Sequence, residues 1–232
     1  MSTAYPPDQL FKVLNEDGAC YHGGRGRWHL PEGDKPGEWM PPIRGKLEPC
    51  TRGYHVLRAS DLPHWLGPAL FTVEARGGRN GVDGKVVVRG ARLLARVETW
   101  NDRTARLFAC DCAERALLQM ERRGTTVDPR SLAAITVARR FAHGEATAEE
   151  LAAAGDAAWD AAWTAAWTAA RAAAWTAAWT AAWTAAWTAA RGDAARHAAW
   201  AAERSWQTAR LMVYLAGETP GAVTLDAVAG PA

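Results

Sequence analysis

The 232-residue chain is poor in cysteine, and its four cysteines are spaced irregularly, at Cys20, Cys50, Cys110 and Cys112. Disulfide-dependent domains are short and carry dense cysteines, so this sequence excludes a disulfide scaffold. The first residues contain neither a basic segment nor an apolar run of signal-peptide length. We therefore expect a cytoplasmic protein with reduced thiols.

The chain also lacks an excess of charge, because 27 Lys and Arg residues stand against 25 Asp and Glu, for a net charge of +2. Strong affinity for a nucleic-acid backbone requires clustered positive charge, so no nucleic-acid partner is expected. Residues 172–190 carry no charge, but they consist of Ala, Thr and Trp without Leu, Ile, Val or Phe. Their transfer to lipid would gain little, so we do not expect a membrane span.

Alanine and tryptophan, in contrast, are concentrated in residues 151–200, which contain 26 Ala and 8 Trp. The first hundred residues instead alternate short apolar runs with Gly and Pro. These patterns predict an α+β fold with a small β-rich module at residues 1–100, a helical domain at 101–216 and a tail at 217–232.

Turn residues divide the first module into short expected strands. Asn15–Gly18 predicts a hairpin turn between Phe11–Leu14 and Ala19–Tyr21, because Asp-Gly accommodates positive φ. Ser60 is expected to cap a short helix that ends before Gly67. Further strands are expected near Trp28–Leu30 and at Gly53–Leu57, Ala69–Ala75, Lys85–Arg89 and Arg92–Glu98, with a turn at Gly77–Gly84 and a bend or bulge at Gly90.

Four groups of residues in this module form a recognisable pattern: Cys50–His55; Asp61-Leu62 with Trp65–Gly67; Leu70–Glu74; and Lys85–Val87 with Arg92–Leu94. On these residues, the segment from about 10 to 100 resembles an uncharacterised domain of phage and actinobacterial proteins. This resemblance implies no activity.

Tyr54, His55 and Glu74 also resemble the site of ADP-ribosyl-transferring folds. That resemblance implies that His55 lies on a first strand, that Tyr54 stacks on nicotinamide and that Glu74 stabilises the developing cation. The simpler alternative is that His55 is an ordinary strand residue and that Glu74, next to Val73, faces solvent. We expect neither an enzyme nor a cofactor, and we treat these three residues as the weak catalytic candidates.

A metal site is the other chemical option in the sequence. Cys20, His22, Cys50 and His55 could converge, but structural zinc sites usually pair ligands two to four residues apart. Cys110 and Cys112 would lie about 200° apart on a helix and could not face one ion. We expect no metal, and we interpret these two cysteines as small buried apolar residues.

Apolar residues at spacings of three and four predict a helical hairpin after residue 100. Its first helix starts at Asn101 or Asp102 and ends near Arg123, and its second has Asp128 as cap and Pro129 at its first position. We expect Leu117, Ile135 and Phe141 in one core, with Leu132, Ala138 and Ala142 on the same face of the second helix. Thr147–Glu150 predicts a capping box for a third helix, and 193–216 predicts a last one.

Several segments between 104 and 216 resemble a family of immunity proteins from polymorphic toxin systems: Leu107–Leu117, Asp128–Arg130, Ala138–Ala142, Gly144-Glu145, Glu149–Leu151 and Trp200–Gln207. This resemblance implies a helical protein that binds a protein partner such as a toxin. The central repeat is more regular and richer in Trp than the family pattern.

The repeat places Trp at every fourth position, and its Ala content predicts a helix. Each step advances the side chain by about 40°, so the row winds by about 280° over about 42 Å. One flat surface cannot bury it, so we expect a homo-oligomer interface at Trp159, Trp163, Trp167, Arg171, Trp175, Trp179, Trp183 and Trp187. A helical spacer, an ice-binding face and a base-stacking row remain alternatives.

The function predicted from the sequence is therefore non-enzymatic protein–protein interaction or self-assembly, of an immunity-like or phage-associated kind. The alternative is an ADP-ribosyl-transferring or nucleotide-binding N-terminal module on a helical oligomerisation stalk.

Overall fold

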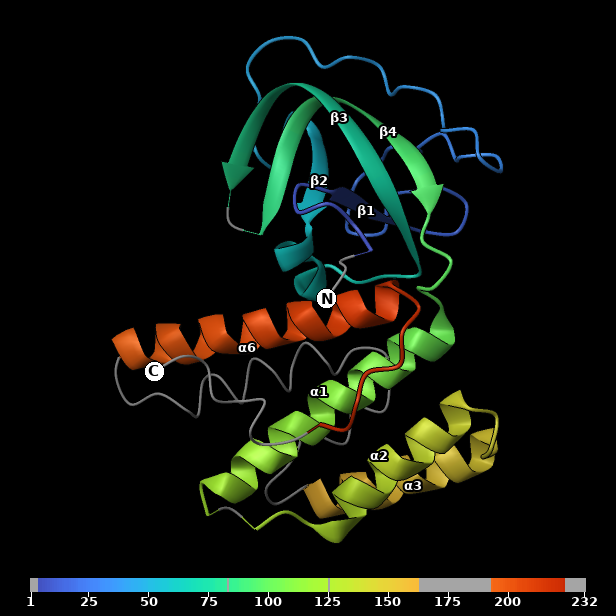
Figure 1. Ribbon diagram of the computed structural model, residues 1–232, viewed down its shortest axis with the longest axis vertical. Helices are drawn as coiled ribbons and strands as arrows, with labels where there is room; N and C mark the ends of the chain where they lie inside the picture. The colour runs from blue at the N-terminus through green and yellow to red at the C-terminus, as the bar shows by residue number, and fades with distance from the viewer. Residues whose placement is uncertain (1–3, 83, 125, 163–192, 224–232) are drawn as a thin grey trace. The chain divides into compact units, whose positions relative to one another are not determined.

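The computed structural model describes residues 4–82, 84–124, 126–162 and 193–223 and divides into two units (Figure 1). One unit comprises Met1–Asn101 with Leu215–Glu218, and the other comprises Asp102–Tyr214 with Thr219–Ala232. The strands belong to the first unit and the long helices to the second, which confirms the α+β class. In the described part of the chain, no helix combines the length and apolarity that crossing a membrane requires.

The first unit is built on an antiparallel barrel in the order β1-β2-β4-β3. The strands are β1 (Leu10–Leu14), β2 (Tyr54–Arg58), β3 (Ala69–Val82) and β4 (Lys85–Arg96). β3 and β4 form the long hairpin that dominates the upper half of Figure 1, and β1 closes the barrel by pairing with β3. Closure gives each of the four described strands two neighbours, although β1 and β2 pair at only two positions.

Alternate strand residues point inward and form the barrel core. Trp28 and Met40 from the segments between β1 and β2 complete it, with Leu10, Leu14, Val56, Ala69, Phe71, Val73, Val86, Val88, Ala91 and Leu93. Lys12 lies between Leu10 and Leu14 on β1, so alternation places an amine on the inner face of the barrel.

The expected hairpin after β1 is only half formed. Asn15 and Gly18 do form the turn, with Gly18 at a φ of 82°. The returning segment makes isolated bridges at Ala19 and Cys20 instead of a strand, and nothing regular forms at Trp28–Leu30. The ladder partners of β1 come instead from β2 and β3, which offer longer runs of free backbone groups.

The expected turn at Gly77–Gly84 is wrong. Of the bend or bulge expected at Gly90, the bulge is the closer description, because a register shift directly follows the Arg76↔Gly90 pair. β3 continues to Val82 with a register shift between Arg76 and Arg79, and β4 passes through Gly90 as one strand. A Cβ atom at Gly90 would lie 3.0 Å from Cγ of Arg76, so glycine makes room for a cross-strand side chain. The short helix is a 3-10 helix at Ala59–His64 (η1), and Arg58, not Ser60, occupies its cap position.

The second unit contains α1 (Asp102–Arg122), α2 (Pro129–Ala142), α3 (Ala148–Ala162) and α6 (Asp193–Leu215). Asp128 caps α2 as expected, because its Oδ1 accepts the backbone N–H of Arg130 at 2.8 Å. The expected capping box of α3 is confirmed as well, since Thr147 and Glu150 each accept the other's backbone N–H.

The hairpin core lies between α1 and α2 and consists of Cys110, Ala113, Leu117, Ile135 and Ala138. The expected membership of Phe141 and Leu132 is wrong. Phe141 is half-buried, with the Arg106 guanidinium 4.8 Å from its ring centroid, and Leu132 is exposed. Both residues lie on α2, whose small Ala134 and Ala138 allow close helix packing and take the buried positions instead.

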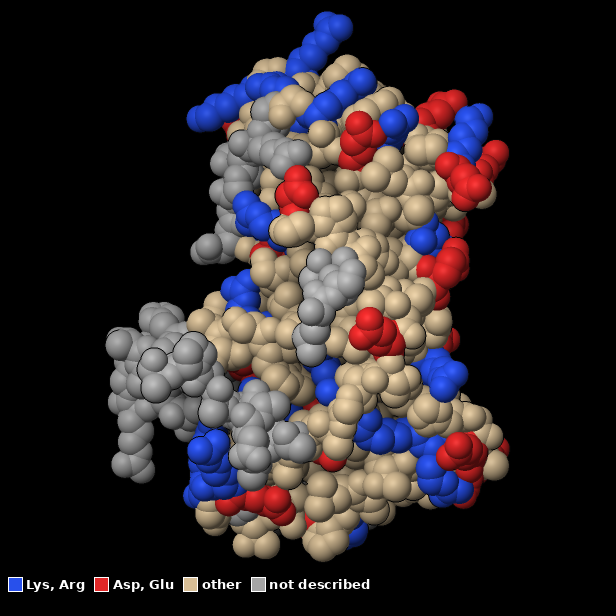
Figure 2. Space-filling model, in the orientation of Figure 1, with Lys and Arg blue, Asp and Glu red and all other residues tan. Residues whose placement is uncertain are grey.

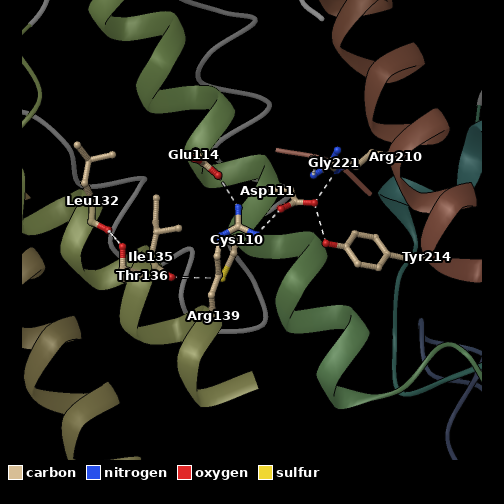
Figure 3. A network of polar contacts seen from close by, with 10 residues as sticks. All are labelled: Cys110, Asp111, Glu114, Leu132, Ile135, Thr136, Arg139, Arg210, Tyr214 and Gly221. Carbon is tan, nitrogen blue, oxygen red and sulfur yellow. Dashed lines mark hydrogen bonds and ion pairs between the residues drawn. The ribbon is translucent and has the colours of Figure 1, made fainter. Parts of the chain in front are cut away.

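A charged group lies at the centre of this helical unit (Figure 3). Asp111 of α1 is fully buried, and its carboxylate accepts hydrogen bonds from Nε of Arg210 at 2.6 Å and from the hydroxyl of Tyr214 at 2.7 Å. Nη1 of Arg139 lies 2.6 Å from the other carboxylate oxygen, and Arg139 also contacts Glu114. One carboxylate therefore connects α1, α2 and α6.

Candidate functional site

The barrel unit contains a cavity of about 530 Å³, which lies within the range of small-molecule sites. It is lined by strand residues Lys12, Val13, Tyr54, His55, Leu57 and Lys85, and by Cys20, His22, Gly23, Gly24, Arg25, Gly26, Trp28, Met40, Cys50, Thr51, Gly53 and Trp65. We call this cavity the β1–β2 slot, after the two strands that contribute most of the strand residues.

The slot exists because β1 and β2 pair over a short stretch. Their register consists of Leu10↔Arg58 and Phe11↔Leu57, whereas β1 keeps five register pairs with β3. Beyond Phe11 the backbone pairing between β1 and β2 ends. There Nζ of Lys12 donates a hydrogen bond to the backbone carbonyl oxygen of His55 at 3.0 Å. This bond satisfies a backbone acceptor at the point where the two strands separate.

Lys12 lies deep in the slot. Its Nζ is 5.2 Å from the centroid of the Trp28 ring, and Trp28 is itself buried against Tyr54, with 5.5 Å between ring centroids. Burial lowers the pKa of Lys12 below its ordinary value, and the Cys20 thiol partly opposes this shift. The barrel thus holds an amine whose charge is poorly solvated.

A second amine lies at the start of β4. Nζ of Lys85 donates to Sγ of Cys50 at 2.9 Å and lies 5.3 Å from the centroid of the Trp65 ring. Cys50 has a φ of 64°, which is rare for a residue with a side chain. Gly53 supports this tight loop, because a Cβ atom there would lie 2.2 Å from Cγ1 of Val87.

His55 connects the two amines. Its Nε2 accepts the backbone N–H of Cys50 at 2.8 Å, so this nitrogen carries no proton in the arrangement observed. Burial is the main cause of the lowered pKa of His55, and the charges of Lys85 and Lys12 lower it further. The ring is therefore held neutral beside two cationic side chains.

The charged side chains that line the slot are all basic. Lys12, Arg25 and Lys85 line it, and among its described lining residues none carries a carboxylate. The imidazole of His22 adds a polar ring, which meets Trp65 edge to face and lies within hydrogen-bond distance of its carbonyl oxygen. Cationic side chains and aromatic rings, without acidic partners, thus surround one cavity.

The three weak catalytic candidates do not come together. Tyr54 and His55 line the slot on β2, but Glu74 lies on β3, which is not a neighbour of β2 in the barrel. The Glu74 carboxylate pairs with Arg92 at 2.7 Å and is largely exposed. An ADP-ribosyl-transferring site would require these three side chains to converge.

Two of the expected metal-ligand candidates, Cys110 and Cys112, are buried in the helical unit, and burial raises the pKa of both thiols. All four cysteines are free. Within the described residues, no three His, Cys, Asp or Glu side chains are close enough to hold a metal ion. Cys20, His22, Cys50 and His55 do all line the slot, but as separate contributors to its wall.

Sequence reasoning missed Lys12, Lys85, Trp28 and Trp65 as site residues. The sequence did contain a signal for Lys12. It lies two residues from both Leu10 and Leu14, so strand alternation places it on the same inward face, where a charged side chain is unusual. Lys85 and the two tryptophans had no such signal, because separate segments bring them to the slot.

The expected oligomer interface at Trp163, Trp167, Arg171, Trp175, Trp179, Trp183 and Trp187 lies outside the described residues, as does the side chain of Trp159. On the face drawn in Figure 2, basic and acidic side chains are interspersed over much of the described surface. Comparisons with family models, with characterised proteins and with solved structures give no significant match. Both family resemblances therefore stay predictions, and function has to be inferred from the slot.

Proposed function

We propose that the N-terminal barrel binds a small anionic molecule with an aromatic part, a class that includes nucleotides. One observation carries this proposal: Lys12, Arg25 and Lys85 line the slot together with Trp28, Tyr54 and Trp65, and no carboxylate is present among its described lining residues. The proposal develops the nucleotide-binding alternative drawn from the sequence and requires no catalytic turnover.

Electrostatics supports an anionic ligand. Burial is the main cause of the lowered pKa of His55, and the positive charges of Lys85 and Lys12 lower it further. A phosphate or carboxylate in the slot would supply the missing counter-charge, and a partly enclosed cavity strengthens that attraction relative to water.

The aromatic side chains support a planar group on the ligand. Trp65 is half-buried at the slot wall, and Tyr54 forms an edge-to-face pair with the buried Trp28. Such rings provide a large contact area, and they fix the orientation of a flat ligand through stacking or edge contacts.

Isothermal titration calorimetry of the full chain with adenosine monophosphate tests this proposal, with adenosine as the uncharged control. We expect the phosphate to increase affinity and added salt to weaken binding. Lys85→Gln should weaken binding, whereas Lys46→Gln, an exposed lysine outside the slot, should leave it unchanged. Equal affinity for the two ligands, or equal effects of the two variants, would refute an anionic site.

For the helical unit we propose protein–protein association, either with copies of itself or with a protein partner such as a toxin. The Ala and Trp content of residues 151–200 supports a long helix whose winding Trp row becomes an oligomer interface. The helix α3 leads directly into this repeat. Sedimentation equilibrium of the full chain, which measures self-association, tests this second proposal.

A further inference from the structure

Lys12 differs from the other lysines of the chain. The sequence contains four lysines, Lys12, Lys35, Lys46 and Lys85, and all of them lie in the barrel unit. Lys35 and Lys46 are exposed, whereas Lys12 lies on the inner face of β1 and reaches the slot. No salt bridge to Lys12 is found among the described residues.

The groups around the Lys12 amine act in opposite directions. The His55 carbonyl on β2, the Trp28 ring and the Cys20 thiol favour the charged ammonium. Burial opposes it, and Lys85 at the start of β4 adds another positive charge to the same slot. Burial is the largest of these influences, so the pKa of Lys12 is lowered and more of the amine is neutral near neutral pH than for an exposed lysine.

We propose that Lys12 is a covalent carbonyl-binding site, whose amine condenses with an aldehyde or keto group of the anionic ligand in the slot. This inference rests on the proposed function and names the ligand more closely, as an anionic aromatic carbonyl compound. A desolvated lysine in an apolar pocket is the usual amine nucleophile for this chemistry.

The reaction is balanced without a redox partner. The nitrogen lone pair attacks the carbonyl carbon, a C–N bond forms, and the carbonyl π electrons move to oxygen, which receives a proton from nitrogen. The carbinolamine then loses its hydroxyl group together with the second nitrogen proton as water, and a C=N bond forms. The product is a neutral imine plus one water molecule.

The slot has the parts that would hold such a ligand during the reaction. Lys85 and Arg25 can bind its anionic group, and the half-buried ring of Trp65 lies at the slot wall to contact its ring. The amine of Lys12 is kept in one place by its 3.0 Å hydrogen bond to the His55 carbonyl. A neutral amine that donates one hydrogen bond still has its lone pair for the attack.

Pyridoxal phosphate, an anionic aromatic aldehyde, is a suitable probe for the full chain. After reduction with borohydride, peptide mass spectrometry assigns the adduct to one of the four lysines. We expect the main adduct at Lys12, its loss in Lys12→Arg, and its persistence in Lys46→Arg, which changes an exposed lysine outside the slot. The Lys12 to Lys35 adduct ratio should fall as the pH rises from about 7 to about 10, where exposed lysines lose their proton as well.

Pyridoxine phosphate, which has an alcohol in place of the aldehyde, separates this inference from the proposed function. It should still bind Lys12→Arg, because Arg25 and Lys85 remain in the slot wall, whereas arginine forms no such imine. Binding of this alcohol without a Lys12 adduct from the aldehyde would overturn the inference alone. Adducts spread evenly over the lysines, or confined to Lys35, Lys46 or Lys85, would overturn it too, and absence of binding by the alcohol would count against the anionic site.

Discussion

Replacing Asp111 by alanine tests whether the buried carboxylate holds the helical unit together. Its two oxygens contact Arg139 at 2.6 Å, Arg210 at 2.6 Å and the Tyr214 hydroxyl at 2.7 Å, and none of its surface is exposed (Figure 3). Removing one partner from a buried ion pair typically costs about 3–5 kcal/mol, because the remaining charges lose their counter-ion.

The neighbours of Asp111 reduce that cost. Arg139 keeps its contact with Glu114, and Arg210 keeps the carbonyl of Gly221. We therefore expect a loss at the lower end, about 3 kcal/mol, in the free energy of unfolding. Asp111→Asn should cost less, about 1–3 kcal/mol, because the amide oxygen still accepts a hydrogen bond.

Denaturant titration followed by far-UV circular dichroism measures these losses. Glu121→Ala is the matched control, since Glu121 is an exposed acid on the same helix α1, and a change within about 0.5 kcal/mol is expected there. A double-mutant cycle with Tyr214→Phe should show coupling between the two groups. A loss below about 1 kcal/mol for Asp111→Ala would refute the argument that this carboxylate joins three helices.

Three further measurements test other parts of the chain. Leu117→Ala, in the α1–α2 core, should lower the free energy of unfolding by about 2–5 kcal/mol, and Phe141→Ala by clearly less; equal losses would contradict the observed core. Burial raises the pKa of Cys110 from 9.0 to about 11, so the unfolded chain loses this proton first. Stability should therefore fall as the pH rises from about 9 to about 11, less steeply in Cys110→Ala, and an unchanged slope would refute this contribution. Sedimentation equilibrium should show that the wild type is an oligomer. Replacing Trp175, Trp179 and Trp183 together by alanine should dissociate it while the helicity is kept. A monomeric wild type would contradict self-association.

The helical part was predicted best where it depends on local contacts. Asp128 and Pro129 mark the start of α2, and Thr147 with Glu150 marks the start of α3. In each case a side chain bonds to a backbone group two or three residues away, so the sequence contains both partners. The predicted face of α2 was confirmed at Ile135 and Ala138, which are buried, but not at Phe141, which is only half-buried, or at Leu132, which is exposed.

The barrel shows the limit of such reasoning. Gly90 was expected to separate two strands at a bend or bulge, yet β4 continues through it, with a register shift beside it and the Arg76 side chain of β3 against it. The pairing of β1 with both β2 and β3 joins segments that are far apart in the chain, and periodicity within one segment says nothing about its partners.

The sequence alone determined the α+β class, the caps of α2 and α3 and the turn at Asn15–Gly18, because each depends on composition or on bonds between near neighbours. Only the tertiary structure placed Lys12, His55 and Lys85 around one slot and enclosed Asp111 among three helices. Those groups meet through strand register and helix packing. Both depend on the summed burial of many side chains and not on any local pattern.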